Sequence, residues 1–328
     1  MSSSPFRWGI LGPGRIAHRF AQALGEVKDA RLQAVASRSA ERAGDFAAQY
    51  GAPAAYDSDE ALASDPAVDA IYIATPHRFH HAQARLCLQA GKPVLCEKPF
   101  TVNAAQALDL IQLARTQDLF LMEALWSRYL PIYRQVRTWL DGGEIGEIRL
   151  VSSTFCFQPE RDPSDRKFNH ALAGGALLDL GIYNVSLSQW AIGEDPSALS
   201  AQARVGDTGV DELTAVTMAY PGGAVAQFAC SLLFDAVNDL TIYGTKGHIR
   251  IHPKFWESTR TTLAVGGSES AASLRFRRNG FEYEIEEAMH CLRSGRRESE
   301  GMPLAATLAN MMTMDQIREQ IGLQYSFE

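Results

Sequence analysis

The chain has few cysteines, and their arrangement marks no redox or metal site. Its five cysteines, at positions 87, 96, 156, 230 and 291, include no C-x-x-C pair and no spacing typical of a metal centre. We therefore expect no metal, and small reduced thiols in the core of a cytosolic protein.

Long apolar runs, repeats and excess positive charge are also missing. No uninterrupted apolar run approaches the roughly 18 residues that a membrane span needs, and residues 1–5 are too short and too polar for a signal peptide. The net charge of −7 argues against nucleic acid or an anionic membrane as the main partner. The 328 residues, 46% hydrophobic and 21% charged, are typical of a soluble, cytoplasmic globular chain with room for two domains.

A glycine-rich turn follows the first apolar segment, residues 6–11. The pattern G-x-G-x-x-A spans residues 12–17 and runs into a helical stretch. In dinucleotide-binding folds the first glycine permits a tight turn and the second lets the backbone approach the pyrophosphate, which lies at the helix N-terminus. The strand–turn–helix context favours this function over a purely structural turn. The expected cofactor contacts here are Gly12, Gly14, Arg15 and Ile16.

The next strand, 32–36, ends in Ser37-Arg38-Ser39, and no carboxylate follows until Glu41. NAD enzymes of this fold usually carry an acid here for the ribose 2′-hydroxyl, whereas an arginine accommodates the 2′-phosphate of NADP. The Arg38 guanidinium can bind phosphate oxygens with two parallel hydrogen bonds, and Ser37 lies beside it. We predict NADP(H), although an exposed loop arginine would give the same pattern.

Short apolar runs alternate with helices up to residue 124, which indicates a parallel sheet with helices on both faces. We assign 1–124 to an NADP-binding Rossmann domain. Ligands of such sheets bind outside the carboxyl ends of the strands. This rule places four segments along one rim: 12–17, 37–39, 75–80 and 97–99.

From about residue 146 many strands follow one another with few helices between them, which indicates a large, mostly antiparallel open sheet. We assign 125–328 to an α+β substrate-binding and dimerisation domain. A helix is expected over 175–192, and a helix over 304–321 is expected to pack back on the first domain. The fold class is thus α/β, a doubly wound parallel sheet plus this second sheet. A sheet covered on one face leaves the other for self-association, so we expect a homodimer or a larger homo-oligomer.

Lys98 follows a buried strand and precedes a proline, which restricts its backbone to extended conformations. A lysine there can point toward the nicotinamide, where its charge favours an alkoxide-like oxygen. Taken alone, it would be better interpreted as a surface lysine at a strand end. Glu97 either pairs with Lys98 or faces solvent; we interpret it as structural, and it is counted with the cofactor-binding residues.

Asp179 and Tyr183 lie four positions apart on the expected helix, hence on one face. The surrounding residues are apolar, so Asp179 is expected to be buried and to need a partner, either Lys98 or a substrate hydroxyl. A tyrosine is a poor base unless a nearby ammonium lowers its pKa. The alternative for Tyr183 is a packed core tyrosine.

Thr75, Pro76, His77 and His80 lie at a strand-to-helix junction on the same rim. Either histidine could contact the nicotinamide ribose or a substrate hydroxyl, and we favour His80 as the catalytic one. A metal site is disfavoured because no further ligands accompany them. Three more side chains are candidates for the substrate pocket, with interdomain packing as the alternative: Trp126, Arg128 and Arg166.

The segments 95–99, 119–124, 174–183, 209–211 and 244–247 together resemble the glucose–fructose oxidoreductase/inositol dehydrogenase family. Within it they are most similar to the dimeric dihydrodiol dehydrogenases, which are also NADP-dependent D-xylose 1-dehydrogenases. The resemblance implies a Rossmann domain followed by an open-sheet domain used for dimerisation, a catalytic Lys98, and a cis peptide before Pro99.

Much of the wider family has a histidine where this chain has Tyr183, whereas the dihydrodiol/xylose subgroup has tyrosine, assisted by a histidine that matches His80. This departure places inositol dehydrogenase activity in doubt. It also favours an NADP-dependent oxidoreductase acting on a hydroxyl of a sugar or cyclic diol.

Three rival hypotheses remain. One is an NADPH-dependent reductase of keto-sugars, of the 1,5-anhydrofructose type. Another is a sugar- or nucleotide-sensing regulator without turnover, which intact Lys98, Asp179 and Tyr183 argue against. The third is a structural scaffold, which leaves the glycine-rich turn unexplained. The substrate, the preferred direction and the exact oligomeric state are not predicted by the sequence.

Overall fold

The computed structural model describes residues 5–328, and its contacts divide the chain into two units. The first unit holds the residues up to Tyr129 together with Arg277–Leu308. The second holds Leu130–Phe276 together with Ala309–Glu328. This division differs from a single cut after residue 124, because a late segment of the chain groups with the first unit. Helix α9, Leu304–Gln320, contributes residues to both units.

The first unit contains, within residues 5–328, a six-stranded parallel sheet in the order β3-β2-β1-β4-β5-β6. Its strands are β1 Phe6–Leu11, β2 Ala30–Ala36, β3 Ala54–Tyr56, β4 Ala70–Ile73, β5 Val94–Glu97 and β6 Leu121–Ala124. Its helices are α1 Arg15–Leu24, α2 Ala40–Tyr50, α3 Asp59–Ser64, α4 His77–Gln89, α5 Ala104–Thr116 and α8 Glu282–Arg293, with a 3₁₀ turn at Trp126–Tyr129. The strand order reverses between β1 and β4, which is where doubly wound sheets bind dinucleotides.

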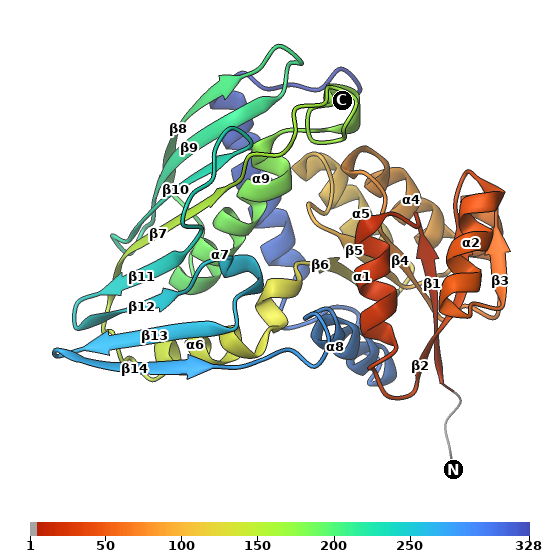
Figure 1. The fold of residues 1–328 in the computed structure, drawn as a ribbon, viewed down its shortest axis with the longest axis horizontal. Coiled ribbons are helices and arrows are strands. Elements are labelled where there is room, and N and C mark those ends of the chain that lie inside the picture. The colour runs from red at the N-terminus through yellow and green to blue at the C-terminus, as the bar shows by residue number, and fades with distance from the viewer. Residues whose placement is uncertain (1–4) are drawn as a thin grey trace. The chain divides into compact units, whose positions relative to one another are not determined.

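Burial explains why these short segments are strands. Every residue of β4, β5 and β6 is buried, as expected of strands covered on both faces. Helix α4 packs between α3 and α5, and α1 packs against α8 (Figure 1). The predicted parallel sheet with helices on both faces is therefore confirmed.

The second unit contains, within the described residues, an eight-stranded sheet in the order β14-β13-β12-β11-β7-β10-β9-β8. Its strands are β7 Ile148–Cys156, β8 Ala198–Val205, β9 Asp211–Ala219, β10 Val225–Ser231, β11 Leu240–Gly244, β12 Gly247–Ile251, β13 Arg260–Val265 and β14 Ser268–Ser273. Neighbouring strands are antiparallel except for the parallel pair β7 and β10 in this part of the chain. The predicted mostly antiparallel open sheet is confirmed.

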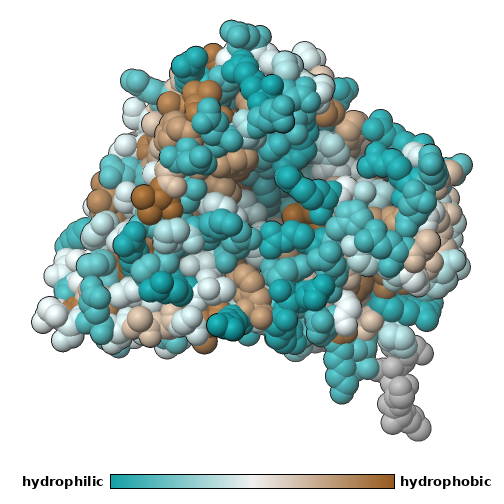
Figure 2. All heavy atoms as spheres, viewed as in Figure 1, coloured by the Kyte–Doolittle hydropathy of each residue, from teal (hydrophilic) through white to brown (hydrophobic). Residues whose placement is uncertain are grey.

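One face of this sheet is covered by helices. Helix α6, Pro131–Asp141, packs on β13 and β14, and α7, Ile182–Ile192, packs on β7 and β10. Side chains alternate along the strands, so that Val216, Phe228 and Ser153 are buried on the covered face. Their neighbours Thr217 and Gln227 are exposed on the other face. In Figure 2, hydrophobic and hydrophilic residues are interspersed over the region that Figure 1 labels β7 to β10.

The expected helix over 175–192 differs at its start. Leu177–Gly181 forms a π-helical turn, and regular α-helix begins at Ile182. The stretch His170–Ile192 is long and apolar enough to cross a membrane by length and composition, but 89% of its most apolar window is buried inside the protein. It is therefore a core helix of the second unit. All five cysteines are buried, free thiols, as expected.

Candidate active site

The glycine-rich turn lies between β1 and α1, at the point where the strand order reverses. Gly12 has φ +90°, and a Cβ at this position would lie 2.5 Å from Thr75 Cγ2, on the loop after β4. Only glycine therefore permits the two loops to approach this closely. Helix α1 starts from Gly14, and no side chain among the described residues caps it. Its first backbone N–H groups are thus left for an anion, as a pyrophosphate requires. Arg15 is exposed and Ile16 is half-buried beside them.

The carboxyl end of β2 presents Arg38 to solvent, and its guanidinium lies 5.5 Å from the centre of the Phe79 ring. Ser37 is buried, and its hydroxyl accepts the Ser39 N–H at 3.3 Å. Ser39 is the N-cap of α2, where it accepts the Arg42 N–H, and the first acidic residue of that helix is Glu41. A cation in a loop without a carboxylate suits a phosphate better than a ribose hydroxyl.

His80 lies in the interior of the first unit with no exposed surface. Its Nδ1 is 2.9 Å from the Pro99 carbonyl oxygen, and its Nε2 is 2.8 Å from the Thr75 carbonyl oxygen. Burial lowers the pKa of His80, and the charge of Lys98 lowers it further, so the ring stays neutral over a wider pH range than an ordinary histidine. His80 thus links the loop after β4 to the peptide that follows Lys98. His77, at the start of α4, is also buried, with its ring 5.9 Å from that of His80.

Lys98 is half-buried directly after β5, and the peptide between Lys98 and Pro99 is cis, as the resemblance implies. The Glu97 side chain does not face solvent. It turns inward, where it accepts the Tyr72 hydroxyl at 2.5 Å and the Lys98 backbone N–H at 3.2 Å. Glu97 therefore holds the backbone of the lysine, and its carboxylate is directed into the interior of the first unit.

A second buried carboxylate supports the same loop from β6. Glu123 has no exposed surface, and its Oε1 accepts the Phe100 N–H at 3.1 Å. Burial raises the pKa of Glu123 to about 7. The loop that carries Lys98 is thus held by His80, Glu97 and Glu123, of which sequence reasoning did not identify the last. Its signals in the sequence are an acid inside an apolar strand and its place in segment 119–124, one of those that carry the family resemblance.

Asp179 and Tyr183 lie in the second unit, on the π-helical turn and on the first turn of α7. Both are buried, with 4% and 5% of their surface exposed. Arg166 Nη2 lies 3.1 Å from Asp179 Oδ2, and the Arg166 side chain remains 36% exposed. The structure therefore brings two of the predicted site residues together as an ion pair, and Arg166 is a partner for the carboxylate that sequence reasoning did not consider.

An aromatic side chain lies beside Tyr183. The Phe155 ring lies 5.7 Å from that of Tyr183 and stacks on Trp256 at 3.6 Å with an interplanar angle of 7°. Sequence reasoning missed both residues, because one lies inside a strand and the other in a 3₁₀ turn at Phe255–Glu257.

Trp126 and Arg128 lie in the first unit and are both buried. The Trp126 indole stacks on Phe281 at 4.7 Å, and the Arg19 guanidinium lies 4.8 Å from its centre. Arg128 donates to the Gly301 carbonyl oxygen at 3.3 Å. These contacts all lie within the first unit and not between the two units, and the place of both residues in the substrate pocket stays a prediction. No group of three or more potential metal ligands occurs in the part of the chain that the structure describes.

Comparison with known proteins agrees with this geometry. Residues 6–125 match the model of an oxidoreductase family with an NAD-binding Rossmann fold, and residues 133–250 match the GFO/IDH/MocA C-terminal domain. The trans-1,2-dihydrobenzene-1,2-diol dehydrogenase of Mus musculus is 38% identical over 97% of this chain and 98% of its own length. That of Homo sapiens is 37% identical over 97% and 98%.

Two solved structures share the fold over nearly the full length. An aldose-aldose oxidoreductase from Caulobacter crescentus, complexed with glycerol, has a TM-score of 0.89 at 25% identity, covering 96% of this chain and 97% of that one. A 3-ketoreductase from Actinomadura kijaniata, in complex with NADP and TDP-benzene, has a TM-score of 0.86 at 27% identity, covering 97% and 98%. The chain is therefore a member of the GFO/IDH/MocA family of oxidoreductases.

Proposed function

We propose that this protein is an NADP-dependent dehydrogenase that oxidises a hydroxyl-bearing carbon of a sugar or cyclic diol, of the D-xylose or trans-dihydrodiol type. One observation carries the proposal. The strand order reverses between β1 and β4. Near this point the glycine-rich turn at Gly12 follows β1, Arg38 follows β2, and Lys98 follows β5. These are the parts that a phosphorylated nicotinamide cofactor and a developing alkoxide need.

The residues present fit a dinucleotide. A Cβ on Gly12 would fill the space between the glycine-rich turn and the loop after β4. The uncapped N-terminus of α1 supplies N–H donors for the pyrophosphate. Arg38, with Ser37 beside it, would hold the 2′-phosphate that distinguishes NADP from NAD. When bound, the cofactor supplies the hydride acceptor of the oxidation. Thr75, Pro76 and His77 are proposed to contact it on the loop after β4.

In the proposed reaction, Tyr183 Oη accepts the proton of the substrate hydroxyl. Lys98 Nζ lowers the pKa of that phenol and favours negative charge on the reacting oxygen. Asp179, held by Arg166, orients the reacting groups. His80 acts indirectly, because its ring lies between the Pro99 and Thr75 carbonyl oxygens, and the one N–H of the neutral ring donates to one of them.

The substrate class follows from what lies near the proposed base. Phe155 lies beside Tyr183 and stacks on Trp256, and this aromatic pair suits the apolar face of a sugar ring or of a cyclic diol. Arg166 adds donors for hydroxyl groups. The names of the relatives, dihydrodiol dehydrogenases, favour the same class. A second candidate is the reverse reaction, reduction of a keto-sugar, which the likeness to a 3-ketoreductase favours.

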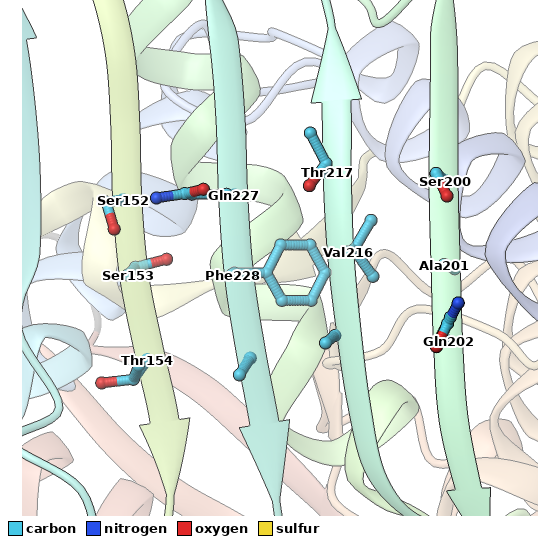
Figure 3. Close-up of a pocket in the computed structure, with 12 residues that line it drawn as sticks. Ser152, Ser153, Thr154, Ser200, Ala201, Gln202, Val216, Thr217, Gln227 and Phe228 are labelled. Carbon is cyan, nitrogen blue, oxygen red and sulfur yellow. The ribbon is translucent and has the colours of Figure 1, made fainter.

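We also propose that the open face of the second sheet mediates homodimerisation. Ser152, Gln227, Thr217 and Ser200 follow one another across β7, β10, β9 and β8 (Figure 3). These are uncharged side chains on a broad face, and with small neighbours such as Ala215 they line a pocket of about 460 Å³. Such a face can bury a second copy without the cost of desolvating charges. The five buried free thiols support a cytoplasmic location.

The experiment is to follow NADPH absorbance while the purified protein is offered NADP⁺ with aldopentoses, aldohexoses, inositols and trans-cyclohexanediols, and with NAD⁺ in parallel. We expect reduction of NADP⁺ by D-xylose or a cyclic diol.

Lys98→Ala and Tyr183→Phe should each lower kcat by roughly 100-fold or more. The exposed residues Lys28 and Tyr243 provide matched controls, Lys28→Ala and Tyr243→Phe, which should retain full activity. Normal turnover in both site variants would refute the assigned roles. If NADP(H) binds but no substrate on the panel reacts, the keto-sugar reductase becomes the better hypothesis.

A further inference from the structure

A buried aspartate, Asp211, lies beneath the segment that carries Asp179 and Tyr183. It is the first residue of β9 and has no exposed surface. Its Oδ2 accepts the Leu177 backbone N–H at 2.7 Å and the Thr214 hydroxyl at 2.8 Å. Leu177 is the first residue of the π-helical turn, so the carboxylate binds an N–H that has no partner within the helix.

The turn before Leu177 passes against the same aspartate. Gly175 has φ +124°, and a Cβ on it would lie 2.1 Å from Asp211 Oδ1. A Cβ on Gly174 would lie 2.5 Å from the Arg166 carbonyl oxygen. Tyr325 Oη donates to the Gly174 carbonyl oxygen at 2.7 Å. The backbone between the Arg166 loop and the π-helical turn therefore has no room to shift without displacing Asp211.

Burying the carboxyl group of Asp211 costs free energy, which a residue that only fills space would not require. Burial raises the pKa of Asp211 to about 7, although the hydrogen bonds from Thr214 and Leu177 lower it. Its Oδ1 has no hydrogen-bond partner among the described residues. An apolar residue of similar volume would avoid this cost, but it could not hold the Leu177 N–H.

We propose that Asp211 is a positioning residue for the reaction. It fixes the first peptide of the π-helical turn, and through that turn it fixes the directions of the Asp179 carboxylate and the Tyr183 phenol. The roles of Asp179 and Tyr183 rest on the proposed function, whereas the contact of Asp211 with the turn does not. Asp211 itself touches neither substrate nor cofactor in this proposal.

The test compares Asp211→Ala, which removes the acceptor, with Asp211→Asn, which keeps an acceptor oxygen of the same reach. Thr261→Val is the matched control, because Thr261 is also fully buried and donates one hydrogen bond, to the Arg250 carbonyl oxygen on β12. Asp211→Ala should lower kcat by about 10- to 100-fold, since a misplacement of about 1 Å has effects of that size. NADP⁺ affinity should stay unchanged, because its proposed contacts lie in the first unit. Asp211→Asn should recover most of the turnover.

Hydrogen exchange gives a readout that does not depend on turnover. The backbone of residues 174–183 should exchange faster in Asp211→Ala than in wild type, and at the wild-type rate in Asp211→Asn and Thr261→Val. If Asp211→Ala does not fold, Asp211→Ser takes its place, because its shorter side chain stays polar and cannot reach Leu177.

Three results would overturn the proposal: full kcat in folded Asp211→Ala or Asp211→Ser, no recovery in Asp211→Asn, or an equal loss in Thr261→Val. Inactive wild-type protein would instead refute the proposed function, and the exchange rates would still decide whether Asp211 fixes the turn.

Discussion

Replacing the buried Glu123 by glutamine should make this protein more stable at high pH and leave its stability at low pH almost unchanged. The reason is the raised pKa of this carboxyl, which burial moves from its ordinary value of 4.5 to about 7. Each pKa unit corresponds to about 1.4 kcal/mol, so the ionised side chain destabilises the folded state by about 3 kcal/mol relative to an exposed glutamate. Glutamine has the same shape and can still accept the Phe100 N–H.

The sign of the effect follows from the order of the two pKa values. Below pH 4.5 the carboxyl is protonated in both the folded and the unfolded state, and wild type keeps its full stability. Between pH 4.5 and about 7 the unfolded state ionises while the folded state still holds its proton, so the free energy of unfolding falls with rising pH. Above pH 7 the loss is complete. Glu123→Gln has no such proton to lose.

Urea denaturation followed by circular dichroism at pH 5, 6, 7 and 8 measures the difference directly. The gap between Glu123→Gln and wild type should widen over this range to about 3 kcal/mol at pH 8. Glu26→Gln, at an exposed position of the same unit, is the control and should show a constant gap. Parallel curves for Glu123→Gln and wild type would refute the reasoning, and kcat should be retained because the loop after Lys98 keeps its acceptor.

The remaining predictions concern the cofactor and the sheet face. Gly12→Ala should weaken NADP⁺ binding by at least about tenfold in a fluorescence titration, because its Cβ would meet Thr75 at 2.5 Å and its φ is +90°. Arg38→Ala should weaken NADP⁺ binding by roughly 10- to 100-fold and leave NAD⁺ binding nearly unchanged, and an equal loss for both would contradict a 2′-phosphate contact. The double variant Thr217→Lys/Gln227→Lys should convert the proposed dimer to monomers in sedimentation velocity, with kcat measured on the monomer as a check on folding.

The cofactor half of the site is predictable from the sequence because its signals are local. A glycine pair between a strand and a helix, and a lysine–proline pair at a strand end, each need only a few neighbouring residues to be recognised. The structure gives Gly12 the close approach to Thr75 that the pattern implies. It also places Lys98 directly at the end of β5.

Strand β14 and helix α6 of the second unit are not predicted, and weak periodicity is the reason for the strand. Strand β14 has the sequence SESAAS, with five of its six residues exposed, and it forms the edge of the sheet. Edge strands commonly lack the apolar alternation that identifies central ones. Helix α6 carries a proline at its start and a buried apolar stripe, so its signal was present but was not used.

The partners of the buried acids could not be predicted, because each partner comes from a distant segment or from an irregular loop. The structure pairs Asp179 with Arg166, 13 positions earlier on a loop, and the expected pairing with Lys98 or a substrate hydroxyl stays a prediction. Glu123 and Asp211 are charged residues at the ends or within strands, where a sequence pattern predicts exposure. Their burial follows from the packing of whole elements around them.

The arrangement of Asp179 and Tyr183 shows that one irregular turn changes which residues share a face of a helix. Residues four apart share a face in an α-helix, but Asp179 lies inside a π-helical turn and Tyr183 lies beyond it. Their relative direction therefore depends on where the wide turn begins and ends. It ends at Gly181, where a Cβ would meet Leu177 Cδ1 at 2.9 Å and Cys230 Sγ at 3.2 Å. It begins at Leu177, where Asp211 holds the N–H. A glycine and a distant aspartate thus determine the geometry that the spacing of four alone would have assigned to a regular helix.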